Sequence, residues 1–373
     1  MYKICHVTSA HKSNDVRIFE KECTSLAKNP DYKVYLVAQG ESYVKNNVHV
    51  IGAGEMPSSR KERMFKFSKT VAEKALKVNA DVYHFHDPEL LQFVGSFVKK
   101  GKKVIFDSHE DVADSILDKE YMPVPVRWGA KSAYNIIQRA VLRKCSYIIT
   151  TTPHIVAKLK RYNPKVAMIT NYPILDEEYE KQFDCSEKNI KTLFFAGGIQ
   201  YQWTHKSIVN AIEDLDDVTY ELYGSSDDGC LDELKTLKGW EKVNYHGSVP
   251  FAQVQEAMHS AGIGVALLKP SNNTGGMLGT IGNTKLFEAM SAGLPVICSD
   301  FKLWKKIVEG NNAGICIRYN DDQALKNAII RLTEDEQLYR QMGENGKRIV
   351  REKFNWASQE KKLLGVYKNI LGK

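Results

Sequence analysis

The residues with the clearest chemical potential stand in the stretch SNNTGGMLGTIGNTKLFE, residues 271–288. Its four glycines allow the backbone to approach a ligand closely, and the helix predicted to follow them presents unpaired N–H groups and a partial positive charge at its first turn. Lys285 adds a full positive charge there, and the carboxylate of Glu288 can accept hydrogen bonds from two neighbouring hydroxyls of a ribose. The pattern therefore suits a nucleotide diphosphate.

A second interpretation of Lys285 and Glu288 needs no ligand. Oppositely charged residues three apart on an exposed helix attract each other, and such a pair stabilises the helix by only about 0.2–0.5 kcal/mol. The spacing fits both interpretations, so the choice depends on the elements that position the two residues.

A second group of polar residues lies in DVYHFHD, residues 81–87, which has the pattern of a strand. Alternation along a strand points His84 and His86 to the same face. We expect His84 to pack inside, and His86 with Asp87 to act at the strand end. The histidines follow the period of the strand itself, so their spacing does not indicate a metal site.

The loop after the first predicted strand, SAHKSNDVR at 9–17, is a natural place for contacts with an acceptor or a diphosphate. Asn14, Asp15 and Arg17 are the candidates within it. The loop lacks the G-x-G-x-x-G pattern, which argues against a dinucleotide-dependent reductase.

The elements that must position these residues follow a regular alternation of short β-branched or aromatic runs and longer amphipathic segments. Strands are predicted at 3–9, 33–39, 48–53, 81–87, 103–109, 147–152, 166–171, 192–198, 218–224, 242–249, 262–268, 294–299 and 314–317. Helices of the first half are predicted at about 16–28, 61–78, 88–99 and 127–144. Apolar strands separated by helices favour parallel sheets covered on both faces, in which ligands bind beyond the carboxyl ends of the strands.

The alternation is interrupted over 174–190, where the chain becomes polar, and we interpret this segment as a hinge region. Residues 1–173 then form a first α/β domain, residues 191–353 a second, and residues 354–373 a final helix. A chain of 373 residues, 43% of them apolar, is too long for one ordinary core, which also favours two domains.

Composition narrows the function classes. No apolar run approaches the length of a membrane-spanning helix, and the first residues lead into a strand rather than a signal peptide. Seven scattered cysteines without a C-x-x-C spacing indicate reduced thiols in a cytosolic protein, not disulfides or a zinc framework. The first 170 residues hold 28 Lys and Arg against 17 Asp and Glu, which indicates either an anionic partner or well-solvated helix faces.

The run KLFEAMSAGLPVICSD at 285–300 closely resembles the donor-site motif of the GT4-type retaining glycosyltransferases, which have two Rossmann-like domains in the GT-B fold. The segment SNDVRIFEKECTSLAK (13–28) resembles the first loop and helix of one bacterial branch of that group. Three further segments are also similar to the group: DVYHFHDPELL (81–91), FDSHED (106–111) and HGSVPFAQVQEAMHSAGIGVALLKP (246–270). The final helix, FNWASQEKKLLGVYKNIL at 354–371, resembles the one that crosses back onto the first domain in this fold. The resemblance spans nearly the whole chain.

The resemblance implies a hexosyltransferase-type enzyme with its donor cleft between an N-terminal acceptor domain and a C-terminal nucleotide-sugar domain. Its expected partners are a UDP- or GDP-linked sugar and a glycan or lipid-linked acceptor, with bacterial surface polysaccharide as the natural setting. No metal and no other cofactor is expected, because lysines and N–H groups can stabilise the leaving diphosphate. No nucleic-acid-binding module is recognisable.

The resemblance also assigns roles to individual residues. His109 ends a strand facing the donor sugar, and His109 and Asp87 are the expected catalytic residues. The expected donor-binding residues are Gly198, Lys206, Gly275, Gly276, Asn283, Thr284, Lys285 and Glu288. The expected acceptor-side residues are Asn14, Asp15, Arg17, His86 and Glu110.

Two departures from the family pattern leave other functions open. Thr280 stands where the family often has a second glutamate, and Gln200 stands about where it often has an arginine. A sugar-nucleotide epimerase of the same architecture, or a non-catalytic subunit that binds nucleotide sugars, are the alternatives. Release of nucleotide only in the presence of an acceptor would separate the transferase from the epimerase.

The basic segment SRKERMFKFSKTVAEKALK at 59–77 predicts a contact with membranes. Its core-facing stripe contains Met64, Phe67, Val71, Ala75 and, one residue beyond, Val78. Phe65 falls off this stripe among the cations Arg60, Lys61, Arg63, Lys66 and Lys69. An apolar ring among cations is typical of a helix that touches anionic lipid, although solvation alone also explains the cations. We expect a cytoplasmic enzyme, peripheral on the inner face of the membrane.

Overall fold

The computed structural model describes residues 1–117, 122–175 and 188–372. The chain divides into two compact units, unit 1 with Met1–Asn171 and Trp356–Lys373, and unit 2 with Tyr172–Asn355. Most of the predicted hinge region, 174–190, lies outside the described residues. None of the described helices is both long and apolar enough to cross a membrane.

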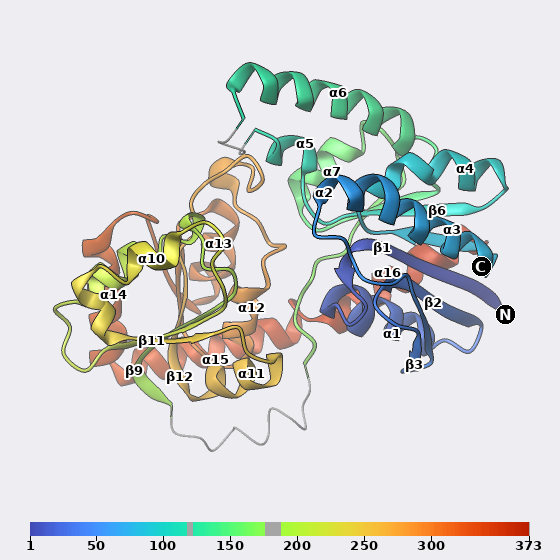
Figure 1. Ribbon diagram of the computed structural model, residues 1–373. Helices are drawn as coiled ribbons and strands as arrows, with labels where there is room; N and C mark the ends of the chain where they lie inside the picture. Colours follow the sequence, from blue (N-terminus) through green and yellow to red (C-terminus); the bar gives the residue numbers. More distant parts are fainter. Residues whose placement is uncertain (118–121, 176–187, 373) are drawn as a thin grey trace. The chain divides into compact units, whose positions relative to one another are not determined.

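Unit 1 is built on an eight-stranded sheet in the order β3-β4-β2-β1-β5-β6-β7-β8 (Figure 1). The strands are β1 (Tyr2–Lys12), β2 (Tyr32–Gln39), β3 (Tyr43–Lys45), β4 (Val48–Gly52), β5 (Val82–Phe85), β6 (Lys103–Ser108), β7 (Tyr147–Thr150) and β8 (Val166–Met168). All neighbours are parallel except the short edge strand β3, which runs antiparallel to β4. The central strands are buried on both faces, as parallel strands between helices must be.

Helices cover both faces of this sheet. One face packs against η2 (Arg63–Phe67), α3 (Ser68–Val78), η3 (Pro88–Phe93), α4 (Val94–Lys99), α6 (Val124–Leu142) and α7 (Pro153–Leu159), and the exposed turn α2 (Arg60–Glu62) precedes η2. The other packs against η1 (Val16–Cys23), α1 (Thr24–Ala27) and the last helix, α16 (Trp356–Leu371). The indole Nε1 of Trp356 donates to Ser25 Oγ at 2.9 Å, which ties α16 to the beginning of the chain. A short helix, α5 (Val112–Ser115), follows β6.

Unit 2 has a six-stranded, wholly parallel sheet in the order β11-β10-β9-β12-β13-β14. Its strands are β9 (Asn189–Ala196), β10 (Thr219–Tyr223), β11 (Val243–Gly247), β12 (Ala261–Ala266), β13 (Val296–Ser299) and β14 (Gly314–Ile317). Its α-helices are α9 (His205–Ile212), α10 (Cys230–Leu234), α11 (Phe251–Ser260), α12 (Thr284–Ser291), α13 (Lys302–Ile307), α14 (Asp322–Glu334) and α15 (Glu336–Glu352). Short 3-10 turns are η4 (Tyr201–Trp203), η5 (Lys238–Lys242), η6 (Gly276–Leu278) and η7 (Glu309–Asn311).

The predicted α/β class with two doubly wound sheets is confirmed. Strand order reverses between β1 and β5 in unit 1, and between β9 and β12 in unit 2. In such sheets the crevice that binds ligands opens at this reversal, outside the carboxyl ends of the strands. The loops after β1, β5, β9 and β12 are therefore the places where a site must be sought.

Candidate functional site

In unit 2, helix α12 begins where the glycine-containing loop after β12 ends. The Asn283 side chain caps it, since its Oδ1 accepts a hydrogen bond from the backbone N–H of Lys285 at 3.1 Å. The helix buries Leu286, Phe287, Ala289 and Met290. This spacing leaves Lys285 and Glu288 on the side of α12 that is only partly covered.

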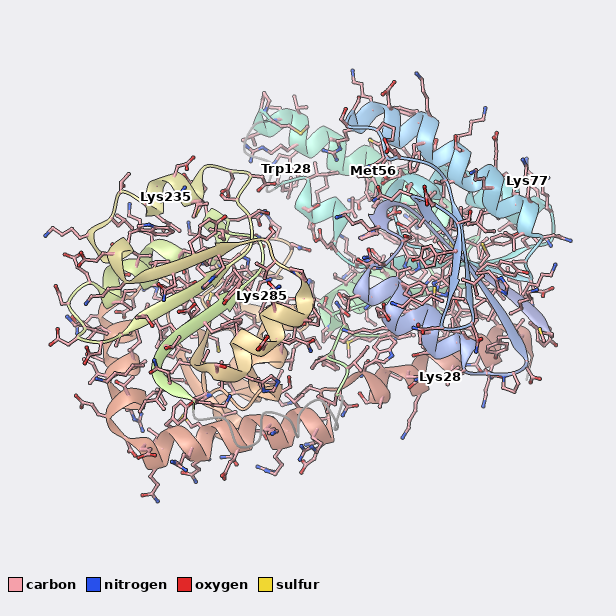
Figure 2. The ribbon with its side chains drawn as sticks, turned by 60° about the horizontal axis from the view of Figure 1, so that its bottom comes forward. Lys28, Met56, Lys77, Trp128, Lys235 and Lys285 are labelled. Carbon is pink, nitrogen blue, oxygen red and sulfur yellow. The ribbon has the colours of Figure 1, made fainter. Side chains whose placement is uncertain are left out.

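The side chain of Lys285, which Figure 2 labels, runs directly over Gly197, the residue after β9, as the distances to a Cβ at Gly197 show. A Cβ on Gly197 would lie 2.1 Å from Lys285 Cε, so only glycine allows this path. Nζ lies 5.4 Å from the ring centre of Phe195 and 4.8 Å from that of Trp203. Burial lowers the pKa of Lys285, which Glu288 partly opposes.

Both charges are unpartnered. Across the described ranges, Lys285 Nζ has no carboxylate within 4.0 Å, and the Glu288 carboxylate has neither a hydrogen bond nor an ion pair. The two side chains line one hollow with residues of β9 and β12. A partly buried cation and a carboxylate that satisfy no other group are free to bind a ligand.

Glycines shape the loops that follow β9 and β10 and the loop that precedes α12. Gly275 and Gly276 adopt φ values of +64° and +63°, the left-handed region that favours glycine. Gly224 approaches Gly197 so closely that a Cβ would lie 1.8 Å from the Gly197 oxygen. A Cβ at Gly198 would meet the side-chain amide carbon of Gln200 at 3.5 Å, an ordinary contact, so this position does not require glycine. Thr284 opens α12 directly after its cap.

Lys206 lies elsewhere. Its Nζ makes an exposed ion pair with Glu233 at 2.7 Å and lines a second hollow of unit 2, not the one with Lys285. Gln200 donates to Asp227 Oδ1 at 3.3 Å. Thr280 serves the loop itself, because its oxygens accept hydrogen bonds from Gly282 and Trp304.

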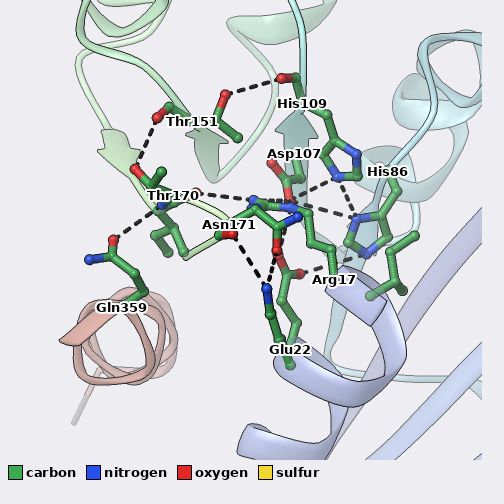
Figure 3. A network of polar contacts seen from close by, with 12 residues as sticks. Arg17, Glu22, His86, Asp107, His109, Thr151, Thr170, Asn171 and Gln359 are labelled. Carbon is green, nitrogen blue, oxygen red and sulfur yellow. Dashed lines mark hydrogen bonds and ion pairs between the residues drawn. The ribbon is translucent and has the colours of Figure 1, made fainter. Parts of the chain in front are cut away.

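In unit 1, His109 follows β6, and its imidazole is hydrogen-bonded to the buried side chain of Asp107. His109 Nε2 lies 3.1 Å from Asp107 Oδ2, and the same oxygen accepts from Arg17 at 2.8 and 3.2 Å (Figure 3). Burial would raise the pKa of Asp107, but Arg17 and then His109 outweigh it and hold that pKa well below its usual range. Asp107 is therefore an ionised, buried anchor for an imidazole that remains 21% exposed.

The backbone of His109 is fixed as well. Thr151 Oγ1 donates to the His109 carbonyl at 3.1 Å, and Thr170 Oγ1 donates to the Thr151 carbonyl at 2.9 Å. The N–H of Thr170 in turn donates to Gln359 of α16 at 3.1 Å (Figure 3). Side chain and main chain of His109 are both positioned by buried hydrogen bonds.

His86 and Asp87 follow β5, and both are buried. His86 lies between two other imidazoles, 3.3 Å from His109 Nε2 and 2.9 Å from His6 Nδ1. Asp87 Oδ2 accepts from Thr8 Oγ1 at 2.8 Å and from the Ser9 N–H at 2.6 Å. Hydrogen bonds from the end of β1 thus occupy this carboxylate.

His11 completes the Asp87 cluster and reaches the surface. Its Nδ1 lies 2.9 Å from Asp87 Oδ1, and its ring centre lies 5.4 Å from that of His109. Burial would lower the pKa of His11, but the bond to Asp87 and the charge of Asp87 raise it overall. The network therefore ends at the surface in two neighbouring imidazoles, His11 and His109.

The expected acceptor-side residues separate into two groups. Asn14 and Glu110 are exposed, and Asp15 caps η1 by accepting from the Ile18 N–H at 2.9 Å. Arg17 is buried with its guanidinium on Asp107, and His86 is only 2% exposed. The acceptor-side role expected of these two residues stays a prediction.

Sequence reasoning missed His11, Asp107 and Glu22 as parts of this network. His11 lies in the loop that was recognised, and Asp107 lies within FDSHED. A charged residue in an otherwise apolar strand was the available signal for Asp107, because a buried carboxylate requires a partner. No local signal paired it with Arg17, which is 90 residues away.

Solved structures similar to this chain confirm the fold. A sucrose-phosphate synthase from Thermosynechococcus elongatus matches with a TM-score of 0.74, 17% identity and 100% coverage of both chains. The Anabaena protein HepE, in complex with UDP and glucose, matches with a TM-score of 0.71 and 13% identity over 99% of this chain and 100% of HepE. The chain has the GT-B fold. At these identities the likeness concerns the fold alone.

Family models match both halves of this GT-B chain. The model described as Glycosyltransferase Family 4 matches residues 15–172, and the model described as Glycosyl transferases group 1 matches residues 176–349. A phosphatidyl-myo-inositol mannosyltransferase of Mycobacterium leprae is 26% identical over 187 residues, which are 48% of this chain and 47% of that protein. The chain spans about half the length of the curated relatives it matches.

Proposed function

We propose that the protein is a retaining glycosyltransferase that moves a sugar from a nucleoside diphosphate to an acceptor hydroxyl. The observation that carries this proposal is the pair of unpartnered charges, Lys285 and Glu288, at the carboxyl edge of the unit 2 sheet. A diphosphate supplies the anion that Lys285 lacks, and a ribose supplies the donors that Glu288 lacks. UDP is the first nucleotide to test, because the structurally similar HepE was crystallised with it.

The chemistry of the donor site is electrostatic. The acceptor oxygen forms a bond to the anomeric carbon, and the bond from that carbon to the diphosphate breaks with its electron pair on the leaving oxygen. The acceptor proton passes to a diphosphate oxygen on the same face, which retains the configuration. Lys285 and the first N–H groups of α12 stabilise the growing negative charge without moving, so this proposal requires no metal at the diphosphate.

Unit 1 supplies the group that positions the reacting sugar. In this proposal, the imidazole of His109 contacts the donor sugar, held in one orientation by Asp107. Asp87 has no free oxygen for chemistry, so we assign it the positioning of the loop that carries His11. A fixed orientation is what catalysis by positioning requires.

The acceptor in this proposal is a lipid-linked glycan of a bacterial surface polysaccharide, met at an anionic membrane. The helix that best fits such a surface is α6, which has no Asp or Glu along its length. Trp128, which Figure 2 labels on α6, is 57% exposed, and Ile136 and Ile137 on the same helix are 71% and 59% exposed. Arg139 and Arg143 add exposed positive charge towards its end. Exposed apolar side chains beside cations are typical of helices that lie on anionic lipid.

The segment at 59–77 fits this role less well than the sequence indicates. Phe65 is 62% exposed as expected. However, Arg63 pairs with Glu89 at 3.1 Å, and Lys66 pairs with Glu62 at 3.3 Å. Because α6 and this segment cover the same face of the unit 1 sheet, both can contribute to one membrane-facing surface (Figure 1).

Acceptor-dependent release of nucleotide tests the proposed activity. Thermal shifts with UDP-glucose, UDP-N-acetylglucosamine and GDP-mannose first identify the donor, since a ligand of the folded state raises its stability. The chosen donor is then incubated with and without a mixture of lipid-linked glycans. Release of nucleotide that requires the lipid supports the transferase, whereas equal release without it indicates the epimerase. A chain that no nucleotide sugar stabilises would be neither.

A further inference from the structure

Four polar side chains meet in the interior of unit 1. They are His6 on β1, Glu22 on η1, His84 on β5, and His86 directly after β5. Glu22 Oε2 lies 3.8 Å from His6 Nδ1, 3.8 Å from His84 Nδ1 and 4.0 Å from His86 Nε2. These distances are too long for hydrogen bonds. Neither oxygen of Glu22 accepts a hydrogen bond from any described residue, although both are fully buried.

The spacing of the four ligand atoms is that of a coordination shell. Two bonds of about 2.1 Å at a tetrahedral angle place their donor atoms about 3.4 Å apart. His6 Nδ1 and His86 Nε2 are 2.9 Å apart, the Glu22 oxygen lies 3.8–4.0 Å from the three imidazoles, and all four atoms lie within 4.8 Å of one another. Three imidazoles and one carboxylate form a donor set that suits zinc and neighbouring transition metals.

The remaining ring nitrogens have unequal surroundings. His6 Nε2 lies 3.2 Å from the Tyr367 hydroxyl, and His86 Nδ1 lies 3.3 Å from His109 Nε2. His84 Nε2 has no hydrogen-bond partner among the described residues, and the Tyr367 hydroxyl lies 2.9 Å from His84 Nδ1. A metal-bound imidazole usually directs its other N–H at a carboxylate, carbonyl or hydroxyl, which fixes the ring, and the Tyr367 hydroxyl is such a group for His6.

The balance of charges in this interior also favours a bound cation. The single guanidinium of Arg17 faces two buried carboxylates, Glu22 at 3.2 Å and Asp107 at 2.8 Å. The three imidazoles are buried beside these carboxylates, and a neutral imidazole has a lone pair that can bind a metal. A buried carboxylate without compensation is costly, and a divalent cation removes that cost.

We propose that His6, Glu22, His84 and His86 bind one divalent transition-metal ion, zinc by the chemistry of the donor set. The site is closed to solvent, so the ion has no open position for a substrate and its role is structural. It joins β1, η1 and β5 directly beneath the Asp107–His109 pair. This site is separate from the diphosphate chemistry of unit 2, which the proposed function leaves free of metal.

Metal analysis of the full-length chain tests the site. Protein expressed with added zinc and desalted should hold about one zinc per chain by mass spectrometry. Because the site is buried, EDTA should remove the ion only slowly from the folded protein and at once in guanidinium. Cobalt-grown protein should show the visible absorption of a tetrahedral ion. Glu22→Gln and His86→Gln should lose the metal, while His205→Asn, which alters a buried histidine of unit 2, should retain it.

The cobalt spectrum of the unaltered protein keeps the test decisive if the two variants fail to fold. Protein grown in zinc or in cobalt that contains less than a tenth of an equivalent of metal would overturn the proposal. The four side chains would then be a hydrogen-bonded core in which Glu22 holds a proton. Full metal content in both folded variants would also overturn it, since the ion would then lie elsewhere.

Discussion

Replacement of Lys285 by methionine tests the donor site most directly. Methionine has a similar length and can still pass over Gly197 and pack against the rings of Phe195 and Trp203. The substitution therefore removes the charge with little change in packing. The amine has no carboxylate partner to leave unpaired in the described part of the chain, so the variant should fold and keep its stability.

The expected loss follows from the setting of the amine. Two unit charges 4 Å apart attract by about 4 kcal/mol at an effective dielectric constant of about 20. Part of that attraction is lost as the diphosphate gives up water, and a hydrogen bond to a charged group retains roughly 1.5–3 kcal/mol. Burial already lowers the pKa of Lys285 in the unliganded protein. The amine has therefore lost much of its hydration before the ligand binds, and binding adds little further desolvation cost at this side chain. Lys285→Met should thus weaken UDP binding about 10- to 150-fold.

Isothermal calorimetry with UDP and with uridine separates the phosphate contribution from that of the nucleoside. The loss should appear with UDP and be absent with uridine. Lys302→Met is the matched control, because Lys302 is an exposed lysine at the first turn of α13 in the same unit. It should bind UDP as the unaltered protein does.

Two outcomes would refute this reasoning. Unchanged affinity of Lys285→Met for UDP would mean that the amine does not face the diphosphate. Equal losses for UDP and uridine would mean that the substitution disturbs the hollow as a whole. Either result would return Lys285 and Glu288 to the simpler role of a charged pair on a helix.

Three further predictions concern other parts of the chain. His109→Gln should lower turnover roughly 100-fold with UDP affinity unchanged, since a misplaced reacting group costs rate rather than nucleotide binding. Burial lowers the pKa of His205 to about 3, so below pH 6.5 the unfolded chain binds a proton that the folded chain excludes. The free energy of unfolding should therefore fall by about 1 kcal/mol between pH 6.5 and pH 5.5, and urea unfolding of His205→Asn should lack this loss. Sedimentation with anionic vesicles should show binding that fades with salt and weakens when Ile136 and Ile137 become glutamate.

Each of these experiments has a matched control and a contrary result. His49→Gln changes a partly buried histidine on β4 and should leave turnover unchanged; an equal loss of UDP affinity in His109→Gln would make that residue structural. A pH dependence that His205→Asn leaves unaltered would assign the acid sensitivity to other groups. Val44→Glu places the same charge at another exposed apolar residue of unit 1 and should not release vesicles. A protein that ignores anionic vesicles at low salt would favour a soluble acceptor.

Periodicity made most of the fold predictable. Every predicted strand is present, because runs such as KVIFDS are apolar on both faces and parallel strands need that pattern. In the described part of the first half of the chain, for which helix positions were predicted, three elements were missed, the edge strand β3 and the short helices α5 and α7. Elements of three to seven residues contain too few turns or alternations to show a period.

The candidate site was predictable where it is local in sequence. Lys285 and Glu288 share one helix with their cap, Asn283, so the sequence alone places them at one end of that helix. The unit 1 network is not local. Arg17 meets Asp107, and His11 meets Asp87, across 90 and 76 residues, and such pairings depend on strand order. For that reason the sequence suggested a surface role for Arg17, which the structure places in the interior.

Polar side chains of the described residues are hydrogen-bonded at the candidate site of unit 1 and unpaired at that of unit 2. This contrast supports the proposal that unit 1 orients the sugar and unit 2 binds the nucleotide. In unit 1, Asp87 and Asp107 are buried and bonded, which fixes His109 and keeps its orientation from varying. In unit 2, Lys285 and Glu288 share a hollow and have no ion-pair partner among the described residues, although a paired arrangement would stabilise the folded chain more. Selection for stability alone would not leave both charges unsatisfied. A rigid, satisfied network suits a group that orients a reacting sugar, and unsatisfied charges suit a site that a nucleotide diphosphate completes.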